Sequence, residues 1–282
     1  MSVEENVQLA MAPLSTGVRL HYAEKGDQGG EAIIFLHGYT DSWYSFMRVL
    51  PLLSPSYHAF ALSERGHGDS DKPECCYTLA DYAADIDAFM DALGIEEATL
   101  VGASGGSFMA RRVALDYPHR VSRLVLVSSA ATLADNEAVM GLGEEMLALE
   151  DPISPEFVRE WQGGNVYRTV PDEFYEKMIS ESLKIPARVW RDYWRGVVLA
   201  PDHASRLGEI AAPTLILWGD KDAVFSREDP ERLAAEIPGA TLKVYPETGH
   251  AVHWERPERV VRDLEEFMRD TRPTATETEE RS

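Results

Sequence analysis

Several features are scarce in this sequence of 282 residues. It contains 2 cysteines, and its 27 lysines and arginines face 48 aspartates and glutamates, a net charge of −21. It also has no uninterrupted apolar stretch of the roughly 18 residues that a membrane-spanning helix needs. Because phosphate contacts require clustered basic side chains, neither nucleic acid nor a membrane is an expected partner. The sequence leaves the oligomeric state open.

The few cysteines and the N-terminal residues bear on localisation. Cys75 and Cys76 are adjacent, so they cannot join distant segments, and the sequence offers neither of them another partner. The first 13 residues include two glutamates where a signal peptide would carry positive charge. Both observations favour a cytoplasmic protein in a reducing compartment.

Metal-binding patterns are missing as well. The sequence has no H-E-x-x-H, no C-x-x-C and no spaced carboxylate loop of the calcium type. We therefore expect no metal and no organic cofactor.

What the sequence does contain is an alternation of strand-length apolar runs with segments of helical period, which is typical of a parallel sheet wrapped by helices. Two runs at 7–14 and 18–23, separated by a turn, predict a hairpin. Further strands are predicted at 32–36, 57–62, 98–101, 121–127, 214–218 and 241–245, and helices at 42–53, 79–93, 108–117, 230–236 and 257–270. The predicted fold class is α/β, with a mostly parallel central sheet flanked by helices.

The alternation stops between about 132 and 210, where helical patterns at 156–161, 172–183 and 187–194 occur without a convincing strand. This predicts a core formed by 1–131 and 211–272, with a helical cap at 132–210 inserted into it. Residues 273–282 contain little to bury and are predicted to form a disordered tail.

The strongest local signal surrounds a serine. Gly102, Ser104 and Gly106 match G-x-S-x-G, an apolar run precedes them, and a helical pattern follows at once. In such a strand-to-helix turn the glycines permit close packing, and the Gly105 amide at the start of the helix can face a developing oxyanion. The pattern indicates acyl transfer with Ser104 as the nucleophile.

Candidates for the acid also follow a strand. Asp220 and Asp222 come directly after the run at 214–218, where an α/β sheet places its functional loops. From position alone the two carboxylates compete.

Taken together, these motifs resemble those of the α/β-hydrolase fold superfamily, of the type with a helical cap after the sixth strand, and the resemblance extends from about residue 18 to 270. It implies that Asp222 is the acid and that His250, in Thr248-Gly249-His250, is the base, whereas His253 belongs to the entry of the final helix. The motif Phe35-Leu36-His37-Gly38-Tyr39 is similar to the family's H-G-x turn, which makes the Tyr39 amide the second oxyanion donor and gives His37 a structural role. In the R-G-x-G-x-S loop at 65–70, Ser63 stands where many relatives carry aspartate, which leaves the partner of Arg65 open.

This resemblance implies a serine hydrolase that cleaves a carboxylic ester or lactone without a cofactor. C–C bond hydrolases and cofactor-free perhydrolases share the same residues, so both stay open, as does a small-molecule receptor on the same fold. Haloalkane dehalogenases and cap-bearing epoxide hydrolases use aspartate at the position of Ser104 and are disfavoured.

Aromatic residues in the predicted cap bear on the substrate. Positions 190, 193 and 194 share one helix face and carry Trp, Tyr and Trp. Together with other aromatics they predict an apolar cleft for a hydrophobic or aromatic small molecule. The candidate substrate-binding residues are Trp43, Trp161, Tyr167, Trp190 and Trp194.

Overall fold

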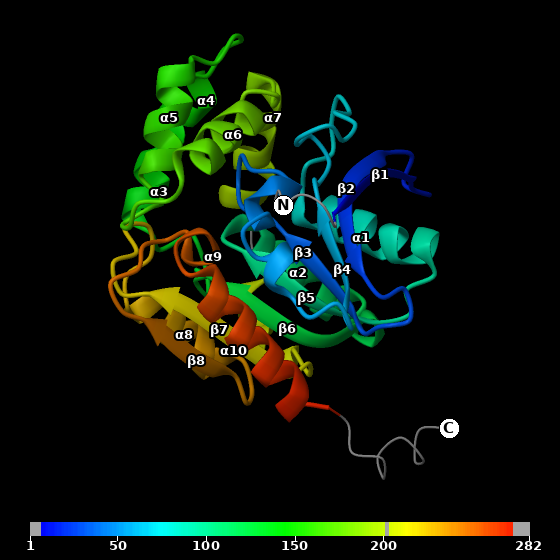
Figure 1. Cartoon of the computed structure of the whole chain (residues 1–282). Coiled ribbons are helices and arrows are strands. Elements are labelled where there is room, and N and C mark those ends of the chain that lie inside the picture. The colour runs from blue at the N-terminus through cyan, green and yellow to red at the C-terminus, as the bar shows by residue number, and fades with distance from the viewer. Residues whose placement is uncertain (1–6, 201–202, 273–282) are drawn as a thin grey trace.

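A computed structural model describes residues 7–200 and 203–272, and its centre is a sheet of eight strands in the order β1-β2-β4-β3-β5-β6-β7-β8 (Figure 1). The antiparallel pairs are β1 with β2 and β2 with β4, and all other neighbours are parallel. The strands are β1 (Gln8–Pro13), β2 (Arg19–Gly26), β3 (Ala32–Leu36), β4 (His58–Leu62), β5 (Ala98–Ala103), β6 (Val121–Val127), β7 (Thr214–Gly219) and β8 (Thr241–Tyr245). The predicted hairpin and mostly parallel sheet are confirmed.

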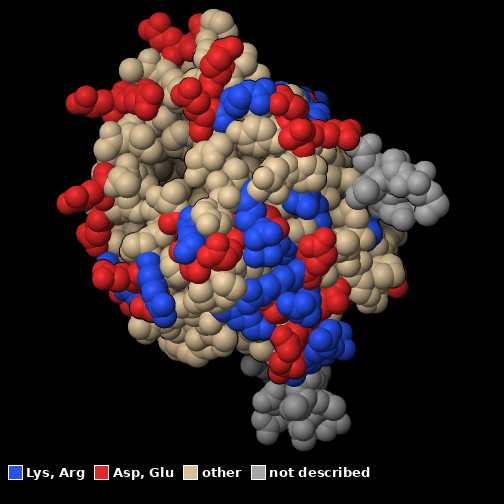
Figure 2. Space-filling model, turned by 60° about the vertical axis from the view of Figure 1, so that its left-hand side comes forward, with Lys and Arg blue, Asp and Glu red and all other residues tan. Residues whose placement is uncertain are grey.

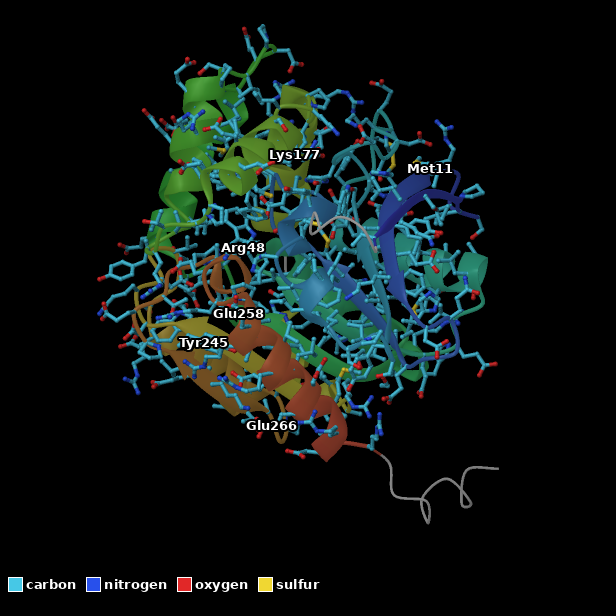
Figure 3. All side chains as sticks on the ribbon, viewed as in Figure 1. Met11, Arg48, Lys177, Tyr245, Glu258 and Glu266 are labelled. Atoms are coloured by element: carbon cyan, nitrogen blue, oxygen red, sulfur yellow. A yellow bond between two sulfur atoms is a disulfide. The ribbon has the colours of Figure 1, made fainter. Side chains whose placement is uncertain are left out.

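Helices cover both faces of the sheet. The helices of the main body are α1 (Leu79–Leu93), α2 (Gly105–Asp116), α8 (Glu228–Glu236), α9 (Val252–Glu255) and α10 (Pro257–Asp270), with a short 3₁₀ turn η3 (Pro118–Arg120). Because successive side chains of a strand point to opposite faces, β3 contributes Ile34 to the apolar layer beneath α1 and α2, and Ile33 to the layer beneath α10. In the second layer, Tyr245 of β8 donates a hydrogen bond to Asp263 of α10 at 2.6 Å (Figure 3).

Edge strand β1 differs from the central strands. Met11, labelled at the sheet edge in Figure 3, is 42% exposed, whereas every residue of β5 and β7 is buried. Strands buried on both faces read as continuous apolar runs, which is why the sequence predicted the central strands well.

The single helix predicted at 42–53 is wrong. The structure has two 3₁₀ turns there, η1 (Trp43–Phe46) and η2 (Leu50–Leu52). Pro51 lacks the N–H that an α-helix would need at this point, and the chain makes i to i+3 bonds such as Met47 N–H to the Tyr44 carbonyl.

The chain between β6 and β7, residues 128–213, forms what we call the β6–β7 segment. Its helices are α3 (Glu137–Gly141), α4 (Gly143–Ala148), α5 (Pro155–Gly163), α6 (Asp172–Ser182), α7 (Ala187–Tyr193), the π-helix η4 (Trp194–Val198) and the 3₁₀ helix η5 (Ala204–Glu209). Helices α4 to α7 gather at one end of the sheet (Figure 1). The three predicted helices are present, and the described residues of this segment contain no strand.

Other sequence predictions concern charge, cysteines and the termini. On the face shown in Figure 2, basic and acidic side chains are interspersed. Buried Arg65, whose partner the sequence left open, forms a bidentate ion pair with Asp85 of α1 at 2.6 and 2.7 Å.

Cys75 and Cys76 form a disulfide between neighbouring residues, a pairing not foreseen from the sequence. None of the described helices is long and apolar enough to cross a membrane. The tail predicted at 273–282 lies outside the described residues.

Candidate active site

Ser104 occupies the sharp turn between β5 and α2. Its φ of 49° is rare for a residue with a side chain, and its N–H donates to the Val127 carbonyl at 2.8 Å. A Cβ on Gly102 would lie 2.4 Å from the Gly106 carbonyl oxygen, and one on Gly106 would lie 2.3 Å from the Leu36 carbonyl oxygen. Only glycine fits at both positions, so the sequence motif reflects a real steric demand.

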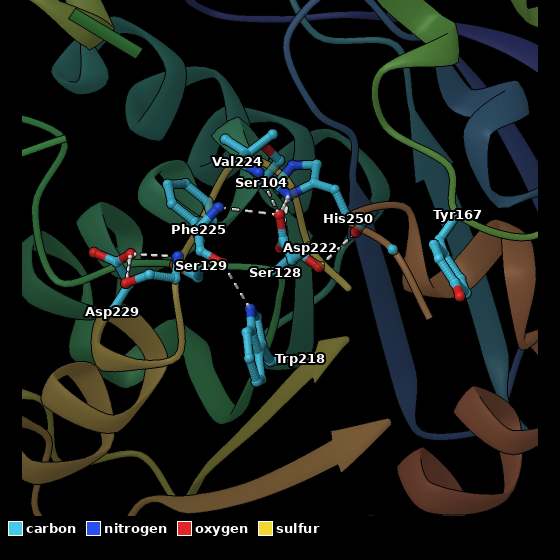
Figure 4. Close-up of polar contacts among 12 residues, drawn as sticks. Ser104, Ser128, Ser129, Tyr167, Trp218, Asp222, Val224, Phe225, Asp229 and His250 are labelled. Atoms are coloured by element: carbon cyan, nitrogen blue, oxygen red, sulfur yellow. Dashed lines mark hydrogen bonds and ion pairs between the residues drawn. The ribbon is translucent and has the colours of Figure 1, made fainter. Parts of the chain in front are cut away.

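Asp222 and His250 form a hydrogen-bonded pair. His250 Nδ1 lies 2.9 Å from Asp222 Oδ2 and 3.0 Å from Oδ1 (Figure 4). The Asp222 carboxylate is fully buried and also accepts the N–H groups of Val224 at 2.8 Å and Phe225 at 3.0 Å through Oδ1. Asp220, the competing carboxylate, is exposed. The structure therefore brings Asp222, rather than Asp220, to the imidazole.

The loop that carries His250 is held from three sides. Ser128 donates to the His250 carbonyl at 2.5 Å, and the Ala251 N–H donates to the carbonyl of Asn165 in the β6–β7 segment at 2.8 Å. The buried Glu255 carboxylate accepts the N–H groups of Gly249, Tyr167 and Arg168 at 2.9 to 3.1 Å. Glu255 was not among the site residues predicted from the sequence, and it fixes the His250 loop to the β6–β7 segment.

Two backbone amides lie beside the nucleophile. A Cβ built on Gly105 would be 3.3 Å from the Tyr39 nitrogen, and one built on Gly38 would be 3.4 Å from the Ser104 Cβ. The Tyr39 loop is held by buried His37, whose Nδ1 donates to the Gly38 carbonyl at 2.7 Å. This geometry places the predicted donors, the Tyr39 and Gly105 amides, next to one another.

The same loop carries a buried carboxylate, Asp41, that the sequence analysis did not single out. It accepts hydrogen bonds from Ser45 at 3.0 Å and from Gln162 of α5 at 2.9 Å. Burial raises the pKa of Asp41 to about 6, against the lowering effect of His37. Near neutral pH this side chain is therefore mostly an anion.

Ser104 and His250 line one cavity of about 320 Å³. Its wall is mainly apolar and aromatic, and none of the described residues that line it is lysine or arginine. Residues from the main body include Tyr39, Asp41, Phe108, Phe225, His253 and Trp254, and those from the β6–β7 segment include Leu133, Val139, Leu142, Trp161, Tyr193, Trp194, Val197 and Val198.

Of the five aromatic residues proposed to bind substrate, Trp161 and Trp194 line this cavity and the other three do not. Trp43 packs against Tyr44, Trp190 is fully buried beneath Tyr39, and Tyr167 is 53% exposed. All five residues are aromatic, so residue type alone could not predict which of them line the cavity.

His253, expected only at the entry of the final helix, also reaches the cavity from α9. Its Nε2 is 2.9 Å from the Ser45 hydroxyl, and burial, reinforced by nearby His250, lowers the pKa of His253 to about 3. A neutral second imidazole thus lies in the wall beside the first.

Comparison with known proteins agrees with this architecture. The family model described as alpha/beta hydrolase fold matches residues 31–163 and 147–257. A 2-hydroxy-6-oxononadienedioate/2-hydroxy-6-oxononatrienedioate hydrolase from Burkholderia vietnamiensis is 31% identical over 90% of this chain and 92% of its own length.

Two solved structures illustrate the range of relatives. A meta-cleavage product hydrolase from Pseudomonas fluorescens has a TM-score of 0.79 and 26% identity, covering 93% of this chain and 98% of its own. A putative aryl esterase from Burkholderia cenocepacia has a TM-score of 0.83 and 24% identity, covering 94% and 99% respectively. The chain therefore belongs to the alpha/beta hydrolase fold family and is a hydrolase.

Proposed function

We propose that this protein is a serine hydrolase that cleaves a carboxylic ester or lactone of an uncharged hydrophobic or aromatic small molecule. One observation carries the proposal. Ser104, on its strained turn, lines the same predominantly apolar cavity as His250, and Nδ1 of His250 is hydrogen-bonded to the buried carboxylate of Asp222. The helices of the β6–β7 segment act as the cap of the active site, because they supply much of the cavity wall.

The reaction proceeds in two acyl transfers. His250 Nε2 accepts the proton of Ser104 as Oγ bonds to the carbonyl carbon, and the carbonyl oxygen becomes an oxyanion facing the Tyr39 and Gly105 amides. The tetrahedral intermediate breaks its bond to the alcohol oxygen, which takes the proton from His250. Water then transfers a proton to His250 and attacks the acyl carbon, and Ser104 leaves with that proton as the carboxylic acid forms.

Charge in the cavity decides which acyl groups are favoured. A substrate with a carboxylate on its acyl chain would meet the Asp41 anion and find no lysine or arginine among the described wall residues. An unpaired charge in a low-dielectric pocket costs several kcal/mol. Uncharged acyl groups are therefore the better substrates.

A matched pair of esters tests this directly. We expect p-nitrophenyl butanoate to be hydrolysed with a kcat/KM at least about 100-fold above that of mono-p-nitrophenyl succinate, which differs by a terminal carboxylate. A preference for the succinate would refute the assignment of substrate class. The Asp41→Asn variant should reduce the ratio of the two kcat/KM values, because it removes the negative charge that the succinate carboxylate would meet.

C–C bond hydrolysis is the second candidate, and it is favoured by the likeness to a meta-cleavage product hydrolase and to the 31% identical hydrolase, whose name specifies a dioate substrate. The wall of this cavity argues against a dicarboxylate for the reason given above. Assaying a vinylogous diketone that carries a carboxylate separates the two, because its cleavage at a rate above that of any p-nitrophenyl ester would overturn the ester proposal.

A binding protein with an inert serine is an alternative from a different class. A fluorophosphonate probe should label the wild type and not Ser104→Ala, because labelling needs an activated nucleophile. Equal labelling of the two would contradict the role of Ser104, and far-UV circular dichroism of the variant controls for loss of folding.

A further inference from the structure

A phenol from the β6–β7 segment reaches the point where the two predicted oxyanion donors meet. A Cβ built on Gly105 would lie 2.0 Å from the Tyr193 hydroxyl oxygen and 3.3 Å from the Tyr39 nitrogen. The hydroxyl thus fills the space that a side chain at position 105 would occupy. Tyr193 also lines the cavity together with Ser104.

This hydroxyl has no hydrogen-bond partner among the described residues, although Tyr193 is only 1% exposed. A buried hydroxyl without a partner is uncommon, because no new hydrogen bond offsets the loss of its bonds to water. Burial, together with the nearby charges of Glu64 and Asp41, raises the pKa of Tyr193 well above 10. The group is therefore a neutral O–H donor at any pH where the enzyme would work.

The position of the phenol is fixed by packing. Its ring stacks on Tyr39 with a centroid distance of 4.6 Å, and the Tyr39 hydroxyl donates to the Trp190 carbonyl of the same helix, α7, at 2.7 Å. Next to α7, a Cβ on Gly196 would lie 2.2 Å from the Tyr77 carbonyl oxygen, so η4 packs directly on the main-body backbone. The donor is held in place before substrate binds, as electrostatic stabilisation requires.

We propose that the Tyr193 hydroxyl is a third donor of the oxyanion hole, supplied by the β6–β7 segment and added to the amides of Tyr39 and Gly105. This inference rests on the proposed function, since it concerns the oxyanion formed by attack of Ser104. It makes the cap a direct part of the catalytic machinery in addition to its role as the wall of the pocket.

Tyr193→Phe is the main test, because it removes one oxygen and keeps the ring that stacks on Tyr39. With p-nitrophenyl butanoate we expect kcat to fall about 100-fold, the low end of what loss of one oxyanion donor costs, while KM changes less than about threefold. Tyr82→Phe is the matched control: its hydroxyl is also buried and unpaired among the described residues, its ring lies 5.7 Å from that of Tyr193, and it does not line the cavity. Tyr82→Phe should leave kcat unchanged.

A second readout distinguishes catalysis from structure. Phenylboronic acid forms a tetrahedral adduct with a nucleophilic serine and places an oxygen in the oxyanion hole, so its inhibition constant should rise about 100-fold in Tyr193→Phe. If the hydroxyl had a purely structural role, the inhibition constant of phenylboronic acid would be the same in Tyr193→Phe as in the wild type, or it would rise only by the same factor as KM. Either result would contradict the proposal.

Gly105→Ala provides a second variant, whose effect is compared in the presence and the absence of the Tyr193 hydroxyl. Its methyl group cannot coexist with the hydroxyl at 2.0 Å, so Tyr193 must move and kcat should fall. In the Tyr193→Phe background the nearest ring atom lies at 3.2 Å, and Gly105→Ala should cost much less there than in the wild type. Additive losses in this cycle would contradict the proposal.

The outcomes separate the two levels of inference. If wild type neither reacts with the fluorophosphonate nor hydrolyses esters, the proposed function fails and the Tyr193 proposal fails with it. If wild type is active and Tyr193→Phe retains its kcat and its boronate affinity, the third donor is refuted and the esterase proposal stands.

Discussion

Asp222→Asn should lower kcat by about 10³- to 10⁴-fold, although the change replaces only one oxygen with an amide nitrogen. The Asn oxygen would keep the place of Oδ1, where it accepts the N–H groups of Val224 and Phe225. The amide NH₂ would then stand at Oδ2, which lies 2.9 Å from His250 Nδ1. Two donors facing one another at that distance repel, and the Asn oxygen, 3.0 Å from Nδ1, already accepts two N–H groups, so the tautomer with the proton on Nε2 is favoured.

With its proton on Nε2, His250 can no longer accept the proton of Ser104. A loss of three to four powers of ten corresponds to about 4–5.5 kcal/mol in the activation free energy. KM should change little, because the cavity wall is untouched. Thermal stability should also hold, since both backbone hydrogen bonds survive.

The assay is hydrolysis of p-nitrophenyl butanoate, with the concentration of folded protein checked by circular dichroism. Asp220→Asn is the matched control because Asp220 lies in the same turn, is exposed and makes no hydrogen bond to His250 among the described residues. A kcat of Asp222→Asn within tenfold of wild type, or a larger loss in Asp220→Asn, would refute the reasoning.

Three further predictions concern stability, each measured from urea unfolding curves. Glu255→Gln should lower the free energy of unfolding by about 1–3 kcal/mol, because an amide replaces a carboxylate that accepts three backbone N–H groups, whereas Glu258→Gln on α10 should have little effect. Asp85→Asn should cost about 3–5 kcal/mol by leaving Arg65 buried without its bidentate partner, whereas Glu176→Gln at the exposed Arg159 pair should cost under about 1 kcal/mol. Since the pKa of His253 drops from 6.5 to about 3 on folding, only the unfolded chain binds this proton between those pH values, and stability should fall by about 1.4 kcal/mol per pH unit on acidification. His253→Gln should make the free energy of unfolding less dependent on pH in this range. An unchanged dependence would contradict the assignment of a low pKa to His253 in the folded state.

How far the sequence predicts this protein depends on whether the information is local. The strands at 32–36, 121–127 and 241–245 and the helices at 79–93 and 257–270 have the bounds that periodicity indicated. Strands β3 and β6 are almost entirely buried, and helices α1 and α10 each bury a regular apolar face, so local propensity and packing agree there. The helix predicted at 42–53 failed because its apolar pattern was read without the missing N–H of Pro51.

The partner of Arg65 shows a different limit. Ser63 could not supply a carboxylate, and the residue that does, Asp85, lies on α1 and faces inward with 3% of its side chain exposed. An aspartate in the middle of an amphipathic helix resembles a solvated residue in sequence. The only available signal was its place on the apolar face of α1, beside Tyr82 and Ile86.

Trp190, Tyr193 and Trp194 show why periodicity alone does not identify a pocket wall. Their spacing correctly predicts one buried face, yet only Tyr193 and Trp194 line the cavity. The wall continues into η4 through Val197 and Val198, whereas Trp190, one turn earlier, covers the Tyr39 ring from outside the cavity. Which residues of the helix reach the cavity depends on how the helix packs on the main body, through contacts remote in sequence such as that of Gly196 with the Tyr77 carbonyl. The same contacts place the phenol of Tyr193, rather than an indole, against Gly105. In the local sequence, the glycine at position 105 indicates that a side chain from elsewhere in the chain occupies this space.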